Sequence, residues 1–150
     1  MTPIELQDAV GEALGHSDWV EVSPERIAAF ADATDDWQAI HLDADAGRAA
    51  GFDGAVAHGF LSLSLLSKMS YEALPRIAGQ SASVNYGFDH IRFLAPVPSG
   101  ARVRAHFTLA AVEPRGDKTL LLSLDVSMEI ESAARPALAA QWRVMIVLAD

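Results

Sequence analysis

The first twenty-two residues combine a helical pattern with a short strand pattern. Apolar residues recur at helical spacing from Ile4 to Leu14, and Gly15 then interrupts the pattern. The spacing therefore predicts a short leading helix. Residues 19–22 alternate between apolar and polar positions, as a half-buried strand does.

Two further helices are predicted before residue 51. Ser23 can cap a helix that begins at Pro24, because serine accepts a hydrogen bond from the first turn and proline fits the first helical position. We expect this helix to run to Thr34. Residues 43–50 indicate one more short helix, and the loop 51–54 follows it, with a glycine at each end.

The longest apolar segment of the chain runs from Ala55 to Tyr71. Leucines at positions 61, 63, 65 and 66 leave little room for a polar face. A helix that is apolar nearly all round belongs inside a protein. We therefore expect a buried central helix here.

From residue 80 onward the pattern has the period of two that is typical of strands. Residues 81–94 could form one long bent strand, which ends at a turn rich in proline and glycine. Three more alternating segments complete the series, at 102–113, 119–131 and 136–147. A buried helix followed by four long antiparallel strands predicts an α+β fold, in which a sheet wraps round a helix.

Composition limits the organisation and location of the chain. Its 150 residues, 51% of them hydrophobic, suit a single domain, 1–150. No cysteine is present, which excludes disulfides and thiolate chemistry and fits a reducing cytoplasm. No segment resembles a leader peptide or a membrane span. We expect a cytoplasmic protein that does not bind membranes.

Charge and motifs exclude several functions. The formal net charge of −9 disfavours nucleic acid as a partner, because binding phosphates needs a basic surface. No phosphate-binding glycine loop or Gly-x-Ser-x-Gly elbow is present, and the histidines lack the spacing of a zinc site. We expect no metal ion and no cofactor.

One pair of polar residues suggests catalysis. Asp36 and His41 lie five positions apart, between two predicted helices, where both could contact one water molecule. Hydration of an α,β-unsaturated thioester needs a group that takes a proton from water and a source of a proton for the α-carbon. Charge that develops on the thioester oxygen needs backbone donors, and the start of the central helix at His58-Gly59 could supply them. From spacing alone, Asp36 could equally cap a helix, and His41 could be a buried structural histidine.

The two segments together resemble the hydratase motif of MaoC-like proteins and (R)-specific enoyl-CoA hydratases. The shared features are an aromatic-Ala lead-in, Asp-x4-His, a second Asp, a Gly-Phe loop and Val-Ala-His-Gly at a helix start. Residues 36–41, 58–66 and 85–97 are most similar to the nodulation-protein-N-like branch. Many hydratases have Asn-Pro inside the Asp-x4-His gap, whereas Gln38-Ala39 stands here.

The resemblance implies a role for each matching residue. Asp36 and His41 would hold the water, and the Gly59 amide would bind the thioester oxygen. Further residues would line the substrate site or shape it: Gln38, His58, Ser67, Asn85 and Tyr86. Coenzyme A is an anion, so a local basic patch is also needed, for which the candidates are Lys68, Arg76, Arg92 and Arg102.

The resemblance also implies a single hotdog fold, with a sheet curled about the helix from Gly59 to Tyr71, and pairing into a homodimer. The expected activity is reversible addition of water to a trans-2-enoyl-CoA to give the (R)-3-hydroxyacyl-CoA. Two alternatives stay open. A hotdog thioesterase would release a free thiol, and a non-catalytic acyl-thioester-binding subunit would be inactive when purified alone.

Overall fold

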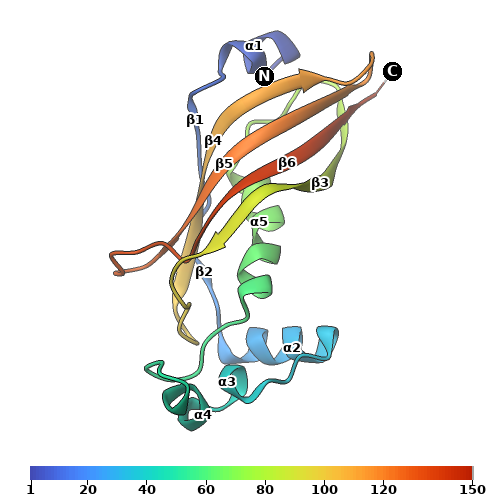
Figure 1. The fold of residues 1–150 in the computed structure, drawn as a ribbon. Helices are drawn as coiled ribbons and strands as arrows, with labels where there is room; N and C mark the ends of the chain where they lie inside the picture. The colour runs from blue at the N-terminus through green and yellow to red at the C-terminus, as the bar shows by residue number, and fades with distance from the viewer. Residues whose placement is uncertain (150) are drawn as a thin grey trace.

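A computed structural model describes residues 1–149, which form one curved antiparallel sheet with helices on its concave side and beyond one end (Figure 1). The strand order is β1-β4-β5-β6-β3, and β2 also pairs with β4. The predicted α+β class is confirmed. The six strands are β1 (Ala13–His16), β2 (Val20–Glu21), β3 (Gln80–Phe93), β4 (Arg102–Pro114), β5 (Thr119–Ile130) and β6 (Leu138–Leu148).

Helix α5 (Gly59–Ala73) runs along the concave side of the sheet, and the smaller helices gather near its two ends (Figure 1). Helix α1 lies near its C-terminal end, and α2, α3 and α4 lie near its start. Helix α2 begins and ends at the predicted residues. The smaller helices are α1 (Pro3–Asp8), α2 (Pro24–Thr34), α3 (Ala39–Leu42) and α4 (Ala44–Ala49).

The core lies between α5 and the concave face. Strands β4 and β6 alternate between buried and partly exposed positions, and their buried residues, such as Phe107 and Trp142, belong to the same cluster as Leu66 and Met69 of α5. Burial of one strand face against one helix face accounts for the alternating pattern in the sequence.

Helix α5 has the expected start and ends two residues beyond the expected Tyr71, but it is less buried than the sequence predicted. It begins at Gly59, because residues 55–58 are extended and Val56 forms a β-bridge with Pro98. One side of the helix is not covered by this chain: Phe60 and Tyr71 are 68% and 73% exposed. The leucine-rich sequence of this helix therefore did not predict that one of its faces is left uncovered within the chain.

The predicted leading helix is shorter than expected. It stops at Asp8, and Gly11 then adopts a left-handed conformation with φ 95° and donates its N–H to Leu109. Ala13 and Leu14 belong to β1, which pairs with β4. A positive φ favours glycine, so Gly11 reverses the chain and turns the end of the apolar pattern into a strand.

Strand β3 forms one edge of the sheet. It pairs with β6 on one side only, and eleven of its fourteen residues are exposed within this chain. The predicted long bent strand is confirmed, and its bend comes from three register irregularities. Asn85 pairs with Val144, a buried residue of the concave face, and Tyr86 lies in one of the irregularities.

The convex face carries ion pairs. Nε of Arg104 and Nε2 of His106 lie 2.7 and 2.8 Å from Oε2 of Glu129. The hydrogen bond from His106, followed by that from Arg104, lowers the pKa of the Glu129 carboxyl. Arg102 forms a second ion pair of this kind with Glu131. Each of these two residues lies two positions from its counterpart in the first group, Arg104 and Glu129.

None of the helices in residues 1–149 has the length and apolar character needed to cross a lipid bilayer.

Candidate active site

Asp36 lies just beyond the end of α2, two residues after Thr34. Asp35 caps this helix in a left-handed conformation with φ 58°, and the Asp36 N–H bonds to the Ala31 carbonyl at 3.1 Å. The Asp36 side chain is 48% exposed. Aspartate is one of the few residues other than glycine that adopt this conformation readily, so Asp35 can end the helix sharply. Of the two adjacent acids, Asp35 is the cap and Asp36 faces the site.

His41 lies on a short helix, α3, where the sequence suggested irregular structure. Its Nδ1 is 2.7 Å from the Val56 carbonyl, and the Val56 N–H returns a hydrogen bond to Ile40 at 3.1 Å. A carbonyl oxygen can only accept, so Nδ1 carries the hydrogen. Nε2 of the neutral ring therefore has a free lone pair.

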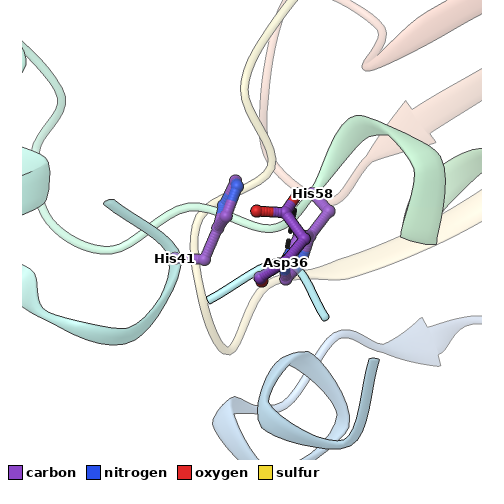
Figure 2. A group of neighbouring side chains, drawn as sticks. All are labelled: Asp36, His41 and His58. Carbon is purple, nitrogen blue, oxygen red and sulfur yellow. Dashed lines mark hydrogen bonds and ion pairs between the residues drawn. The ribbon is translucent and has the colours of Figure 1, made fainter. Parts of the chain in front are cut away.

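His58 lies beneath this pair and is only 2% exposed. Its Nε2 is 2.9 Å from the Asp36 backbone carbonyl and therefore donates to it. Its ring stacks on that of His41 at a centroid distance of 3.7 Å (Figure 2). The resemblance implied that His58 lines or shapes the substrate site, and the structure places it under Asp36 and His41, bonded to the Asp36 backbone.

These three side chains form one cluster. One carboxylate oxygen of Asp36 and one nitrogen each from His41 and His58 all lie within 4.8 Å of one another. A water molecule with hydrogen bonds of about 2.8 Å can span such a gap. The arrangement can thus hold one water between the Asp36 carboxylate and the His41 imidazole.

The same cluster is poorly arranged for a metal ion. Imidazole lone pairs lie in the ring plane, and the planes of His41 and His58 differ by only 26° in their stack. Lone pairs of two stacked rings point side by side and do not converge on one ion. We assign no metal to these residues.

Gly59 is the first residue of α5, and its N–H has no acceptor among the described residues. His58 occupies the N-cap position, but its side chain makes no capping hydrogen bond. The start of this fifteen-residue helix therefore presents free donors and the positive end of the helix dipole. A Cβ on Gly59 would lie 3.1 Å from the Phe93 ring, so this ring packs directly on the helix start.

Gln38 links the two catalytic candidates through its backbone. It is the N-cap of α3, its carbonyl accepts the His41 N–H at 3.0 Å, and its own N–H is 3.4 Å from the Asp36 carboxylate. Its side chain makes no capping bond and is exposed. That amide is free to contact a ligand.

The other expected site residues lie apart from the cluster within one chain. Ser67 is eight residues beyond Gly59 on α5, which places it about 12 Å along the helix axis. It is half-buried. Asn85 and Tyr86 lie in the middle of the edge strand β3 and are exposed. No hydrogen bond or ring contact in residues 1–149 joins these three side chains to Asp36 or His41.

The four basic candidates for the coenzyme A phosphates fall into two groups. Lys68 pairs with Glu72, and Arg102 pairs with Glu131. Arg76 and Arg92 are exposed and form no ion pair with a described residue. Arg92 is adjacent to Phe93, at the end of β3 nearest Gly59.

Sequence reasoning missed three residues that shape the site. Phe30 packs on His58 at a centroid distance of 4.9 Å, Val56 binds His41, and Phe93 covers Gly59. In the sequence, Phe30 could be recognised only as the aromatic residue that begins the hydratase motif. The other two act through a backbone carbonyl and a contact 34 residues away, and neither leaves a local signal.

The segment that carries the site is lightly packed. Among residues 32–55, Gly47 alone is buried in this chain. A Cβ on Gly47 would lie 2.0 Å from the Gly54 carbonyl oxygen, so α4 packs closely on the loop before Val56.

A sheet wrapped round a helix, with an Asp–His pair at the start of that helix, defines a class of protein. A family model described as "MaoC like domain" matches residues 5–126, and the chain belongs to this family. The MaoC-like family of 3-hydroxyacyl-thioester dehydratases and (R)-hydratases acts on acyl thioesters. The family predicted from the motif is thus confirmed.

Individual relatives agree with this assignment. The chain is 43% identical to Nodulation protein N of Rhizobium leguminosarum bv. viciae, over 95% of this chain and 89% of that protein. It is 40% identical to 3-hydroxyacyl-thioester dehydratase Z of Mycobacterium tuberculosis (strain ATCC 25618 / H37Rv), over 95% of this chain and 94% of that protein.

Solved structures confirm the predicted hotdog fold. The MaoC-like dehydratase from Rhodospirillum rubrum matches with a TM-score of 0.79 at 19% identity, covering 95% of this chain and 94% of that one. An (R)-hydratase from A. caviae involved in PHA biosynthesis matches with a TM-score of 0.69 at 25% identity, covering 87% and 94%.

Proposed function

We propose that this protein is an (R)-specific enoyl-CoA hydratase that also catalyses the reverse dehydration. The observation that carries the proposal is the meeting of three groups at one end of α5. They are the Asp36 carboxylate, Nε2 of His41 and the N–H of Gly59, and neither of the last two has a hydrogen-bond partner within residues 1–149. Dehydratase Z and the A. caviae (R)-hydratase are named for this class of reaction, which supports the proposal.

The reaction follows from the roles that these groups can fill. The thioester oxygen accepts a hydrogen bond from Gly59, which stabilises the negative charge that develops there. His41 accepts a proton through Nε2 as the water oxygen bonds to the β-carbon. The other O–H of the water donates a hydrogen bond to the Asp36 carboxylate, which orients the water. The double-bond electrons move to the thioester, and the proton taken from water returns to the α-carbon.

We also propose that the active form is a homodimer joined along β3. This strand leaves one edge unpaired within the chain over fourteen residues, and the exposed residues Phe60 and Tyr71 lie on the helix beside the sheet. An unpaired edge strand of this length is a template for pairing with another strand. Two-fold pairing would extend the sheet and cover both features in each copy.

Such a dimer would explain a cavity at the far end of α5. The cavity has a volume of about 560 Å³ and is lined by Ser70, Tyr71, residues 79–83 and the concave residues Val144 and Ile146. Antiparallel pairing brings the start of one β3 beside the end of the other. The end of β3 packs on Gly59, so one protomer's cavity would adjoin the partner's catalytic pair and receive its acyl chain.

A panel of trans-2-enoyl-CoA substrates from four to sixteen carbons tests the proposed reaction. We expect loss of the enoyl absorbance with purified protein alone. Coupling the product to a dehydrogenase that accepts only (S)-3-hydroxyacyl-CoA should give no NADH until a racemase is added. Rapid NADH formation without the racemase would contradict the (R) assignment.

Two other results would replace the proposal. Release of a free thiol from saturated acyl-CoA without hydration would identify a thioesterase. Tight binding of acyl-CoA with neither reaction, restored only by a second hotdog protein, would identify a binding subunit.

A further inference from the structure

We infer that His58 is a positioning residue, which fixes Asp36 and His41 relative to each other and exchanges no proton with the substrate. The inference rests on the proposed function for its kinetic readouts. It adds to that function, because the reaction above needs only Asp36, His41 and Gly59.

The first support is burial. The His58 side chain is 2% exposed, and its ring contacts those of Phe30 and His41. The Asp36 side chain, in contrast, is 48% exposed. A group that transfers a proton to substrate must reach it directly or through one water. His58 faces its neighbours in the protein instead.

The second support is the hydrogen bond to Asp36. Nε2 of His58 donates to the Asp36 backbone carbonyl at 2.9 Å and lies 4.0 Å from the Asp36 carboxylate. The bond joins two segments that are 22 residues apart in the chain. It ties the start of α5, where Gly59 presents its N–H, to the residue just beyond α2.

The third support is the stack on His41. Nδ1 of His41 is held in the ring plane by Val56, at 2.7 Å, and the face of the ring is held by His58 at a centroid distance of 3.7 Å. A hydrogen bond to one atom leaves the ring free to tilt about that bond. The stack removes this freedom and so fixes the direction of the Nε2 lone pair.

The remaining nitrogen of His58 argues against a role in filling space alone. Nδ1 is buried and has no hydrogen-bond partner among the described residues. Burying an unpaired polar atom is unfavourable, and an apolar side chain of similar size would avoid it. The bond from Nε2 to Asp36 explains why an imidazole is suited to this place.

Two substitutions separate the two contacts. His58→Phe keeps a ring between Phe30 and His41 but removes the donor to Asp36. His58→Gln keeps an amide donor three bonds from Cβ, as in histidine, but removes the ring. We expect each to lower kcat by about tenfold, and His58→Ala by about a hundredfold. Affinity for a saturated acyl-CoA should stay within about twofold, because the site that binds it is intact.

Kinetics of the three variants can overturn the inference in two ways. If His58 transferred a proton, Phe, Gln and Ala would be equally inactive, and the pH profile of kcat would lose one limb. If His58 only supported the fold, kcat per folded site would be unchanged while the folded fraction fell. Circular dichroism and active-site titration provide the folded fraction, and His16→Gln, at an exposed position of β1, is the matched control.

A double-mutant cycle provides a further check. If His58 acts through His41, then His58→Ala should cause little additional loss of turnover in a His41→Ala background. Losses that simply multiply would contradict this dependence.

A spectroscopic readout keeps this test distinct from the proposed function. The chain has five histidines, so ¹⁵N labelling and a His41→Ala variant can assign the His41 ring. Nδ1 of His41 should carry the hydrogen in both proteins, because Val56 accepts it in each. In His58→Ala the ring resonances of His41 should broaden, because loss of the stack lets the ring tilt about that bond. An unchanged spectrum would overturn the inference. A changed spectrum in a protein without hydratase activity would support the positioning role and reject the proposed function.

Discussion

The carbonyl oxygen of Val56 lies 2.7 Å from Nδ1 of His41, and this contact determines which nitrogen of the catalytic candidate is free. Val56 is also held in place, because it forms a β-bridge with Pro98. The orientation of His41 is therefore set by the backbone of a segment fifteen residues away and, through it, by the chain near residue 98.

Asp36→Asn and His41→Ala, tested separately, should each lower turnover by at least about a hundredfold, the low end for loss of a general acid or base. Neither residue belongs to the core, so the fold should persist. Steady-state hydration rates and circular dichroism measure the two effects. A variant that keeps near-normal turnover, free of contaminating enzyme, would remove that residue from the mechanism.

Gly59→Pro should lower turnover by about a hundredfold or more, because it deletes a donor to the thioester oxygen. Proline fits this position structurally: Gly59 is the first residue of α5, and His58 before it is extended, with ψ 134°. Binding of a saturated acyl-CoA should change much less, which calorimetry can measure.

Gly59→Ala is the matched control for that substitution. It retains the N–H, and the three atoms nearest to its Cβ all belong to the Phe93 ring, the closest at 3.1 Å. We expect a loss of turnover below about tenfold. Equal losses in the two variants would show that the steric contact, and not the donor, is responsible.

The edge strand predicts a measurable assembly. Native protein should have twice the chain mass of 16.0 kDa in light scattering. Val84→Glu combined with Tyr86→Glu places like charges on both copies of the proposed two-fold contact, and should yield monomers with reduced turnover. Ser127→Glu, on the exposed face of the central strand β5, should leave the dimer intact. A dimer that survives the β3 changes would place the interface elsewhere.

The ion pairs of Glu129 predict a small acid-dependent term in stability. Hydrogen bonds from His106 and Arg104 lower the pKa of this carboxyl below its usual 4.5. A lowered pKa in the folded state stabilises the protein above about pH 4.5, and this stabilisation disappears as the pH falls through the folded-state pKa. The Glu129 side chain is 38% exposed, so solvent screens these pairs and the effect should be below about 1 kcal/mol.

Thermal unfolding of Glu129→Gln measures this term. The variant should melt below the native protein at pH 7, and the difference should vanish as the pH falls below 4. Glu12→Gln, an exposed acid outside this network, is the control. A difference that persists in acid would show that packing, and not charge, links Glu129 to its neighbours.

Sequence patterns predicted the elements whose burial is regular. The helix from Pro24 to Thr34 and the long strand near 81–94 were predicted nearly to the residue, because a cap and a period of two are local signals. Ala13 and Leu14 were assigned to a helix because their spacing fits either structure. Their pairing with β4 depends on Gly11 and on partners more than ninety residues away.

The candidate site was predictable in part for the same reason. Asp36, His41 and Gly59 stand in a motif, and the structure gathers them at one end of α5. Spacing could not reveal that His58 lies beneath the pair, since its depth depends on the ring of Phe30 and on a stack formed in three dimensions. Ser67, Asn85 and Tyr86 lie elsewhere in this chain and stay predictions.

Because residues 32–55 are lightly packed, the active site should be less stable to heat than the rest of the fold. This stretch buries little apolar surface, so the sheet and α5 supply most of the free energy of unfolding. Asp36 and His41 depend on a handful of hydrogen bonds that can open while the core remains closed. Heating should therefore inactivate the protein before it melts, and amide hydrogens of this stretch should exchange with solvent long before those of β5.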